Sequence, residues 1–459
     1  MVAGAIPVHA RCARVVIALV VAVLAAGCAS DSTPDATTPG AVPIPTQIDD
    51  SGETSADDTD TDDDTDGGDG TDTGGAAEAD PTPTAETIIV NPTVEGPEPL
   101  RIVALMGETG VMDQIDGPAL AGVVAEVDRL NEDGGLLGLP ITVQRIDTNS
   151  RTSVALREME RVVETPPDLI IVTCDIEFSK PILELADANG LVTISPCADD
   201  PGYFTAGWGA RNFTMGAPAE PRGAIAADTA MSRYGPTALV LRDKTSPEAL
   251  RFCDGFESTF RALGGSVTYR DEFSYDTLEP LRDRLAERAR PTSSIVVCSH
   301  MPGGVDAAPS IISLLRNDIG LTAPIVAGTT LDDPRLFSAV PVLGEMTYVT
   351  WSSLYANDPD ARVNDIVNRA NRNLDTPVGG ATTILGAEAV EAWALAITTA
   401  RSADPALVSV ALGSFSNEAF ATGPVSFVAN ARMDTDRTYR VMRVIGGDIE
   451  VPELAIVAG

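Results

Sequence analysis

The chain has 459 residues, with 31 basic and 67 acidic side chains and a formal net charge of −36. A chain of this length is too long for one small core. Such an excess of negative charge, with Lys180 and Lys244 as the only lysines, excludes nucleic acid as an expected partner. With His9 and His300 as the only histidines, multi-imidazole zinc sites and a Ser-His-Asp relay lack the residues they need.

Residues 1–28 have the layout of a secretory signal peptide. Arg11 and Arg14 precede an uncharged run over 15–26, which is too short to span a bilayer and ends at Gly27 and Cys28. The ending LAAGC resembles a bacterial lipobox, in which the cysteine is acylated and becomes the new N-terminus. We therefore expect lipid anchoring at Cys28. The alternative is a plain secretory signal with an incidental cysteine.

Residues 29–97 are expected to form a disordered acidic linker. They carry 18 acidic side chains and no lysine or arginine, which is half of the net charge. Too little apolar surface is present to offset the entropy of ordering, and a flexible coil of this length spans about 45 Å. Asp62, Asp64 and Asp66 imitate the start of a calcium loop, but Thr73 stands where that loop needs its glutamate. No metal site is predicted.

Residues 98–459 are expected to form the folded domain, because short β-branched runs alternate there with helical-period segments. The predicted strands are 101–106, 141–146, 169–174, 191–195, 238–241, 294–298, 324–327, 425–428 and 438–444. The predicted helices are 117–131, 153–164, 247–262, 360–373 and 381–401. Alternation of this kind is typical of an α/β protein with doubly wound parallel sheets.

Four stretches resemble the type I periplasmic binding proteins of the branched-chain amino acid and amide class. They are RIVALMGETG with its following helix (101–139), LVTISPCADDP (191–201), ALVLRDK (238–244) and GPVSF (423–427). The resemblance covers essentially all of residues 98–459. It implies two doubly wound lobes joined by three crossover strands near Phe213, 348–351 and 424–427. Lobe 1 would comprise about 98–213 and 352–424, and lobe 2 about 214–350 and 425–459.

Open parallel sheets bind ligands at the carboxyl ends of their strands, and the resemblance places a ligand between the lobes. These ends fall at 107–110, 174–177 and 197–199 in lobe 1, and at 244–246, 298–301 and 328–330 in lobe 2. The candidate ligand-binding residues are Glu108, Thr109, Asp175, Glu177, Ala198, Asp199, Ser246, His300, Met301, Thr329, Thr330 and Trp351. Trp351 lies at a proposed crossover, and Tyr203, Phe204 and Trp208 are further aromatic candidates for stacking.

The charges differ from those of an amino-acid site. In amino-acid binders of the family, hydroxyls and backbone amides of the first lobe hold the ligand carboxylate, and a second-lobe acid holds the ammonium. Here Asp175, Glu177 and Asp199 stand in the first lobe, and neutral Thr329 and Thr330 in the second. Carboxylates repel a carboxylate ligand, so we expect a cationic, amide-like or polyhydroxylated ligand. The alternative is that the acids cap helix N-termini.

Four cysteines remain after the signal region in an oxidising compartment, and they allow three pairings. Cys174 and Cys197 end consecutive strands of one lobe, whereas Cys253 precedes the strand of Cys298 in the other. We therefore predict disulfides 174–197 and 253–298, with free buried thiols as the alternative.

The predicted function is extracytoplasmic capture of a small solute and, by resemblance, its delivery to the permease subunits of an ABC importer, with the lipid anchor holding the protein at the membrane. The solute would be an amino acid, an amide or another small polar or cationic compound. No catalytic residues, cofactors or metals are predicted, because the common nucleophile, zinc and nucleotide motifs are missing from the sequence. A sensing module of the same fold that acts through a protein partner is the alternative function.

Overall fold

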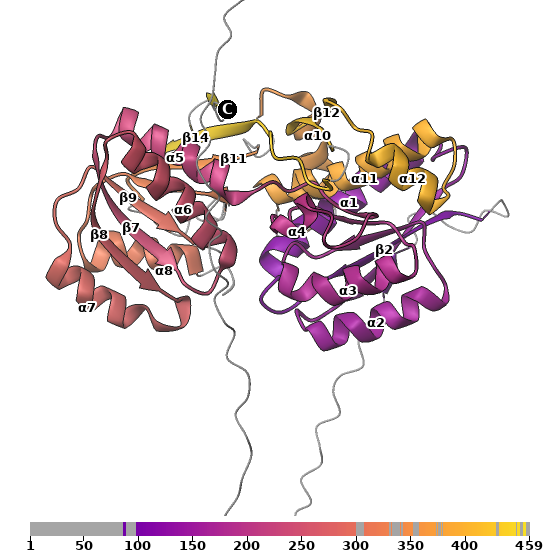
Figure 1. The fold of residues 1–459 in the computed structure, drawn as a ribbon, viewed down its shortest axis with the longest axis horizontal. Helices are drawn as coiled ribbons and strands as arrows, with labels where there is room; N and C mark the ends of the chain where they lie inside the picture. Colours follow the sequence, from indigo (N-terminus) through magenta and orange to yellow (C-terminus); the bar gives the residue numbers. More distant parts are fainter. Residues whose placement is uncertain are drawn as a thin grey trace, which may run out of the picture. The chain divides into compact units, whose positions relative to one another are not determined.

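The structure is a computed structural model. It describes residues 86–88, 98–299, 307–329, 332, 340, 343–351, 358–372, 374, 378, 380–427, 431–446, 448–449 and 453–455. These residues form two largely parallel sheets covered by helices (Figure 1), so the predicted α/β class is confirmed. The predicted signal segment lies outside them. So does the predicted linker, except for Glu86–Ile88, which form a strand rather than linker.

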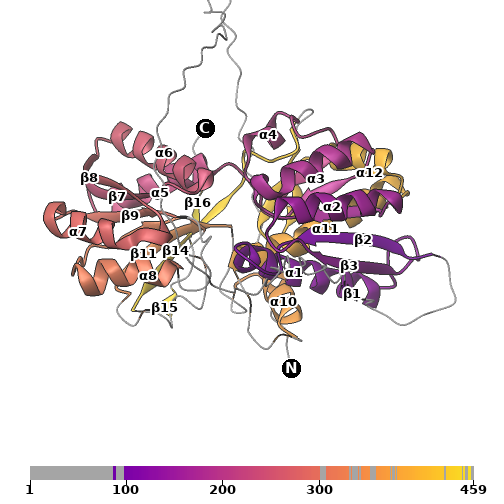
Figure 2. The same cartoon turned by 90° about the horizontal axis from the view of Figure 1, so that it is seen from below.

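The first sheet has six strands in the order β1-β3-β2-β4-β5-β6. Their bounds are β1 (Glu86–Ile88), β2 (Leu100–Met106), β3 (Ile141–Asp147), β4 (Leu169–Val172), β5 (Thr193–Ser195) and β6 (Asn212–Thr214). Neighbouring strands are parallel except at the edge, where β1 runs antiparallel to β3 (Figure 2).

Helices cover both faces of the first sheet because its strands are apolar on both faces. Alternate residues of β2 enter separate core clusters. Ile102 packs with α1 (Asp113–Glu132), α11 (Gly380–Ala400) and α12 (Pro405–Leu412), and Val103 packs with α2 (Thr152–Glu164) and α3 (Ile176–Ala188). The short α4 (Pro201–Phe204) follows β5, and α10 (Ala361–Ala370) packs against α1.

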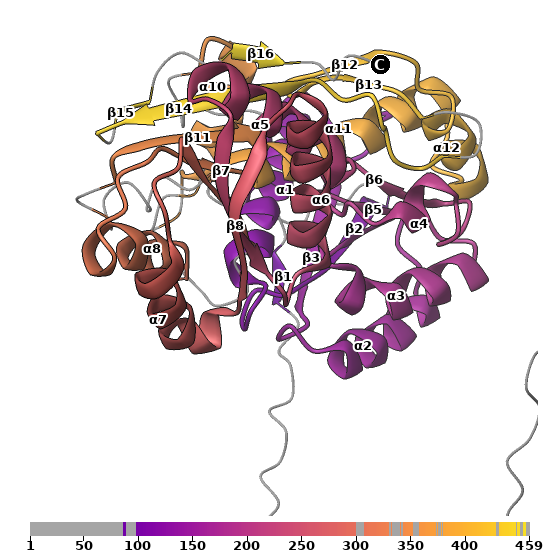
Figure 3. The ribbon, with the colours of Figure 1, turned by 60° about the vertical axis from the view of Figure 1, so that its left-hand side comes forward.

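The second sheet has the order β15-β14-β11-β10-β9-β7-β8, with β16 also paired to β14. Its strands are β7 (Thr237–Asp243), β8 (Ser266–Phe273), β9 (Ser294–Cys298), β10 (Ile325–Ala327), β11 (Glu345–Thr350), β14 (Tyr439–Ile445), β15 (Asp448–Ile449) and β16 (Glu453–Ala455). Strands β7 to β11 are parallel, whereas β14 returns antiparallel beside β11 (Figure 3).

Both faces of the second sheet are also covered. Val240 of β7 shares a core cluster with α5 (Ala219–Arg233) and α6 (Pro247–Ala262). Leu239 and Leu241 face the opposite cluster, with α7 (Leu278–Arg288) and α8 (Ala307–Ser313). A 3-10 turn (Tyr275–Thr277) precedes α7, and a π-helix (Leu314–Asp318) follows α8.

The chain passes between the two sheets after β6, after β11 and again before β14. The third passage comes later than the predicted 424–427. Phe427 still packs on Phe213, with ring centroids 5.2 Å apart, and the Thr214 N–H donates to the Arg432 carbonyl at 2.9 Å. Met433 belongs to the core of the first sheet, so the passage follows it.

The predicted strand 425–428 is wrong in its extent. Strand β13 (Gly423–Val425) ends at Val425 and pairs antiparallel with β12 (Glu418–Phe420) in a separate hairpin.

Both predicted disulfides are present. Cys174 is bonded to Cys197 and Cys253 to Cys298, with Cα–Cα distances of 4.9 and 5.7 Å. The first joins the ends of β4 and β5, and the second joins α6 to β9. Each bond therefore stays within the elements of one sheet.

Candidate functional site

Glu108 and Thr109 lie in the loop after β2, where their polar groups bind β3. Glu108 forms an ion pair with Arg145, and its N–H donates to Asp147 at 3.0 Å. The Thr109 hydroxyl and N–H also donate to Asp147, at 2.7 and 3.2 Å. These contacts fasten the loop to the neighbouring strand.

Asp116 of α1 also holds the loop after β2, by hydrogen bonds to backbone N–H groups. This residue was not predicted from the sequence. Its carboxylate is buried and accepts from the N–H of Gly107 at 2.8 Å and of Cys174 at 3.3 Å, thereby joining the ends of β2 and β4. Burial raises the pKa of Asp116 to about 7, although the hydrogen bonds from Gly107 and Cys174 lower it. No motif marks this residue, because an aspartate in a first helical turn is ordinary.

The predicted acids Asp175 and Glu177 belong to the start of α3. Asp175 is its N-cap and accepts from the Glu177 N–H at 2.7 Å, so helix capping, the alternative considered for these acids, is what Asp175 does. Glu177 is exposed in the first turn of α3. It lines a surface pocket rather than joining Asp199.

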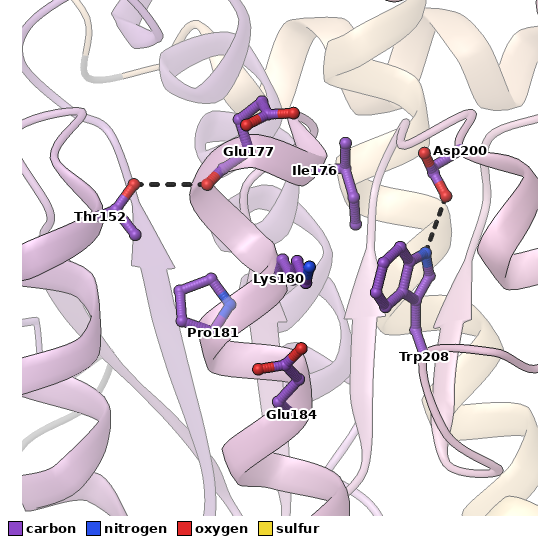
Figure 4. Close-up of a pocket in the computed structure, with 8 residues that line it drawn as sticks. All are labelled: Thr152, Ile176, Glu177, Lys180, Pro181, Glu184, Asp200 and Trp208. Carbon is purple, nitrogen blue, oxygen red and sulfur yellow. Dashed lines mark hydrogen bonds between the residues drawn. The ribbon is translucent and has the colours of Figure 1, made fainter. Parts of the chain in front are cut away.

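That pocket has a volume of about 470 Å³ and lies among α2, α3 and the segment around α4 (Figure 4). Trp208 forms one wall and donates from Nε1 to Asp200 at 2.8 Å. The Lys180 ammonium lies 5.5 Å from the centroid of the Trp208 ring. Of the three aromatic candidates Tyr203, Phe204 and Trp208, Trp208 is the one that lines this pocket. Tyr203 is buried in the core, and Phe204 is 44% exposed.

Asp199 lies at the end of β5 but binds two arginines of the second sheet's helices. Arg251 of α6 donates to Asp199 Oδ1 at 2.6 Å, and Arg222 Nη2 of α5 lies 3.8 Å from Oδ2. Burial raises the pKa of Asp199 to about 7, and Glu248 acts in the same direction, whereas the two arginines lower it.

Arg222 connects Asp199 to further predicted residues. Its side chain is buried, pairs with Glu248 at 2.5 Å and donates to the Thr329 hydroxyl. The guanidinium carbon lies 4.8 Å from the centroid of the Trp351 ring. We call these six residues the Arg222 cluster: Asp199, Arg222, Glu248, Arg251, Thr329 and Trp351.

The structure therefore brings three predicted residues together, namely Asp199, Thr329 and Trp351. Sequence reasoning missed Arg222, Glu248 and Arg251. Charged residues near helix N-termini usually face solvent, so their pattern carried no distinctive signal. The one available signal was the position of Glu248 and Arg251, three residues apart at the start of α6, the helix that follows β7.

Ala198 and Ser246 have structural contacts. The Ala198 N–H donates to Ser195 Oγ at 3.1 Å, and its carbonyl accepts from the Thr214 hydroxyl at 2.8 Å. Ser246 is the N-cap of α6 and accepts from the Ala249 N–H at 3.2 Å. The predicted residues His300, Met301, Thr330 and Cys28 lie outside the described residues.

Within the described part of the chain, no group of three or more His, Cys, Asp or Glu side chains could hold a metal ion. No helix found there is long and apolar enough to cross a bilayer.

Comparisons with known proteins agree with this architecture. The family model of periplasmic binding proteins matches residues 99–448, which is most of the chain. No curated protein sequence matches the chain.

Solved structures share the fold at low sequence identity. The branched-chain amino acid transporter substrate-binding protein LivJ of Streptococcus pneumoniae, in complex with isoleucine, is 18% identical with a TM-score of 0.66, covering 78% of this chain and 100% of that protein. The leucine-binding protein LivK of Thermotoga maritima is 19% identical with a TM-score of 0.64, covering 78% and 98%. A solute-binding protein of an ABC transporter from R. palustris, in complex with benzoate, is 16% identical with a TM-score of 0.65, covering 79% and 98%.

The family match covers most strands of both sheets and agrees with the type I resemblance seen in the sequence, so the chain belongs to the periplasmic binding protein family.

Proposed function

We propose that this protein is an extracytoplasmic, lipid-anchored solute-binding protein that captures a small polar ligand between its two lobes and delivers it to an ABC importer without catalysing a reaction. The family is one of solute-binding proteins rather than enzymes. Neighbours of the same fold hold isoleucine or benzoate, which supports a small-molecule ligand.

The observation that carries the proposal is the Arg222 cluster. Asp199 follows a strand of the first sheet and pairs with Arg251, which follows a strand of the second. Glu248 and Thr329 also follow strands of the second sheet, and both contact Arg222, which lies 3.8 Å from Asp199. A site built from the strand ends of two sheets can hold a ligand on two sides, and hinge closure between the lobes would bury it. We assign ligand contacts to this cluster, while the remaining predicted residues stay as candidates.

The lobe boundaries are proposed as about 98–213 and 352–433 for lobe 1, and about 214–350 and 434–459 for lobe 2. The contacts of Phe427 and Met433 with the core of the first sheet support the shift of the last boundary.

A thermal-shift screen of the purified protein tests the binding function. Amino acids, amides, polyamines, sugars and nucleosides would be compared, because a ligand that prefers the folded state raises the melting temperature. We expect at least one small solute to do so. Uptake of that solute, labelled, should fall in cells that lack the gene, whereas unchanged uptake would contradict delivery to an importer.

Lipid anchoring at Cys28 rests on the lipobox-like ending of the signal segment. Cys28→Ser is expected to move the protein from the membrane fraction to the soluble fraction, and globomycin should cause accumulation of the unprocessed form. Membrane association that is unchanged in Cys28→Ser would contradict the anchor.

A further inference from the structure

The Arg222 cluster retains hydrogen-bonding capacity that the protein does not use. Four buried polar atoms in it have no hydrogen-bond partner, namely Asp199 Oδ2, Arg222 Nε, Arg251 Nε and Trp351 Nε1. An unpartnered buried polar atom is unfavourable, and such atoms are uncommon in folded proteins. Three of these atoms are N–H donors and one is an acceptor, and all belong to side chains that contact one another through Arg222 and Asp199.

Among the described residues of the cluster, two carboxylates stand beside two guanidinium groups, so their formal charges balance. Arg222 pairs with Glu248 at 2.5 Å, and Arg251 pairs with Asp199 at 2.6 Å. Arg222 and Trp351 are 1% and 2% exposed, so a further charge placed against them is largely removed from water. A buried charge without its own counter-ion is strongly unfavourable, whereas a neutral group that accepts and donates hydrogen bonds has no such penalty.

From this combination of spare hydrogen-bonding groups and balanced charge, we infer that the Arg222 cluster selects an uncharged ligand, in which a hydrogen-bond acceptor for the arginine and tryptophan N–H groups lies next to a donor for Asp199. Carboxamides and vicinal hydroxyls have this chemistry. Ammonium ions, carboxylates and free amino acids bring charges that the cluster leaves uncompensated. The inference rests on the proposed solute-binding function and narrows the ligand range expected from the sequence by removing cations.

Matched compounds test the inference. Each of several carbon skeletons, for example isobutyl and phenyl, would be presented as the carboxamide, the carboxylate, the amine and the α-amino acid, together with a panel of sugars and polyols. Thermal shift and calorimetry on the purified protein at pH 8 would rank them. That pH lies above the raised pKa of Asp199, about 7, so the carboxylate is mostly ionised. We expect uncharged compounds to bind at least tenfold more tightly than charged compounds on the same skeleton, or a polyol to bind best.

Two variants reverse the charge balance in opposite directions. Asp199→Asn leaves Arg251 without its counter-ion and should move the preference at least tenfold towards the carboxylate. Arg251→Gln removes the guanidinium nearest to Asp199 and leaves two carboxylates with one guanidinium in the cluster, which should move the preference towards the amine. Arg261→Gln is the matched control, because it makes the same substitution at an exposed arginine of α6. Its ranking of the compounds by affinity should equal that of the unmodified protein. If Asp199 and Arg251 had only a structural role, the variants would lower the affinity for all ligands alike and would not change their order by charge.

The outcomes separate the inference from the function on which it rests. If a charged compound or a free amino acid binds the unmodified protein best, the inference is wrong and the binding function stands. If uncharged compounds bind best but neither variant changes the ranking, the assignment to this cluster is wrong. If no compound of any class binds, the proposed function itself is contradicted, and the inference falls with it.

Discussion

Asp116 shows how one buried carboxylate positions the loops around the candidate site. It accepts hydrogen bonds from the N–H groups of Gly107 and Cys174, which follow β2 and β4. Burial raises its pKa from 3.8 to about 7, so the folded state holds the proton more tightly than the unfolded state. The stabilising contribution of the protonated form is therefore complete below about pH 4 and is lost as the pH rises towards 7.

Asp116→Asn should remove this part of the pH dependence, because the amide does not ionise. Between pH 4 and pH 7, the free energy of unfolding should fall less in the variant than in the unmodified protein, by at most roughly 4 kcal/mol. Urea unfolding at several pH values measures this change in the free energy of unfolding. Asp133→Asn, at the exposed end of the same helix, serves as the control. An unchanged slope in Asp116→Asn would show that Asp116 does not titrate in this range.

A second buried carboxylate, Glu388, lies beside the buried guanidinium of Arg437. Glu388 and Arg437 are both fully buried, with Oε2 and Nη2 3.8 Å apart, and Thr422 bridges them by donating to both carboxylate oxygens at 2.6 Å and accepting from Arg437. Burial raises the pKa of Glu388, whereas Arg437 lowers it.

Arg437→Met should lower the free energy of unfolding by about 3–5 kcal/mol, because it leaves a buried carboxylate without its counter-ion. Adding Glu388→Gln should restore part of the loss, since the uncompensated charge is then removed. Chemical unfolding of the two single variants and the double variant measures the coupling. Strictly additive losses would show that the pair does not interact.

At the scale of elements, α1 and α11 approach closely because two glycines meet at their crossing. A Cβ atom added at Gly122 would lie 1.9 Å from the Thr383 carbonyl oxygen, and one at Gly386 would lie 1.9 Å from that of Ala119. Glycines also allow a close approach where α5 packs against α6. There, Cβ atoms at Gly223 and Gly255 would lie 2.0 and 2.2 Å from backbone oxygens.

Gly122→Ala should therefore lower the free energy of unfolding by about 1–3 kcal/mol, because the helices must separate to admit the methyl group. Gly117→Ala in the same helix is the matched control, since nothing lies within 4 Å of its added Cβ. This control should change the free energy by less than about 1 kcal/mol, because the helix propensity of alanine is offset by Pro118, which disfavours a helical residue with a Cβ before it. Thermal or urea unfolding compares the two. Similar effects of both substitutions would contradict the close crossing.

At the scale of the whole molecule, each of the two disulfides links elements of one sheet, and among the described residues no disulfide joins one sheet to the other. Cys174–Cys197 closes a separation of 23 residues, and Cys253–Cys298 closes one of 45. Replacing the second pair by alanines should lower the free energy of unfolding by about 2–4 kcal/mol, and by about 0.6 kcal/mol more than replacing the first pair from loop closure alone.

Ligand affinity in the Cys253→Ala/Cys298→Ala protein should be unchanged below its unfolding transition, because neither cysteine belongs to the Arg222 cluster. Calorimetry with the ligand found by screening measures this affinity. A large loss of affinity in the folded variant would show that the disulfide fixes the site as well as the fold.

The sequence by itself determined the class of the fold, because buried parallel strands are short apolar runs and their helices have a local period. Helix α6 has the predicted bounds, 247–262. Strand β8 was not predicted, since alternate residues of SVTYRDEF are exposed at the sheet edge and its apolar signal is weak. Both disulfides followed from the order of strands and helices.

Only the tertiary structure decided the electrostatics of the candidate site. Asp199 is 23 residues from Arg222 and 52 from Arg251 along the chain, and no local pattern links them. The sequence therefore presented Asp199 as an unopposed negative charge, whereas the folded chain neutralises it with arginines from helices of the other sheet. Periodicity reports which face of an element is buried, but the pairing of buried charges depends on which elements meet, and that is fixed only when the sheets pack.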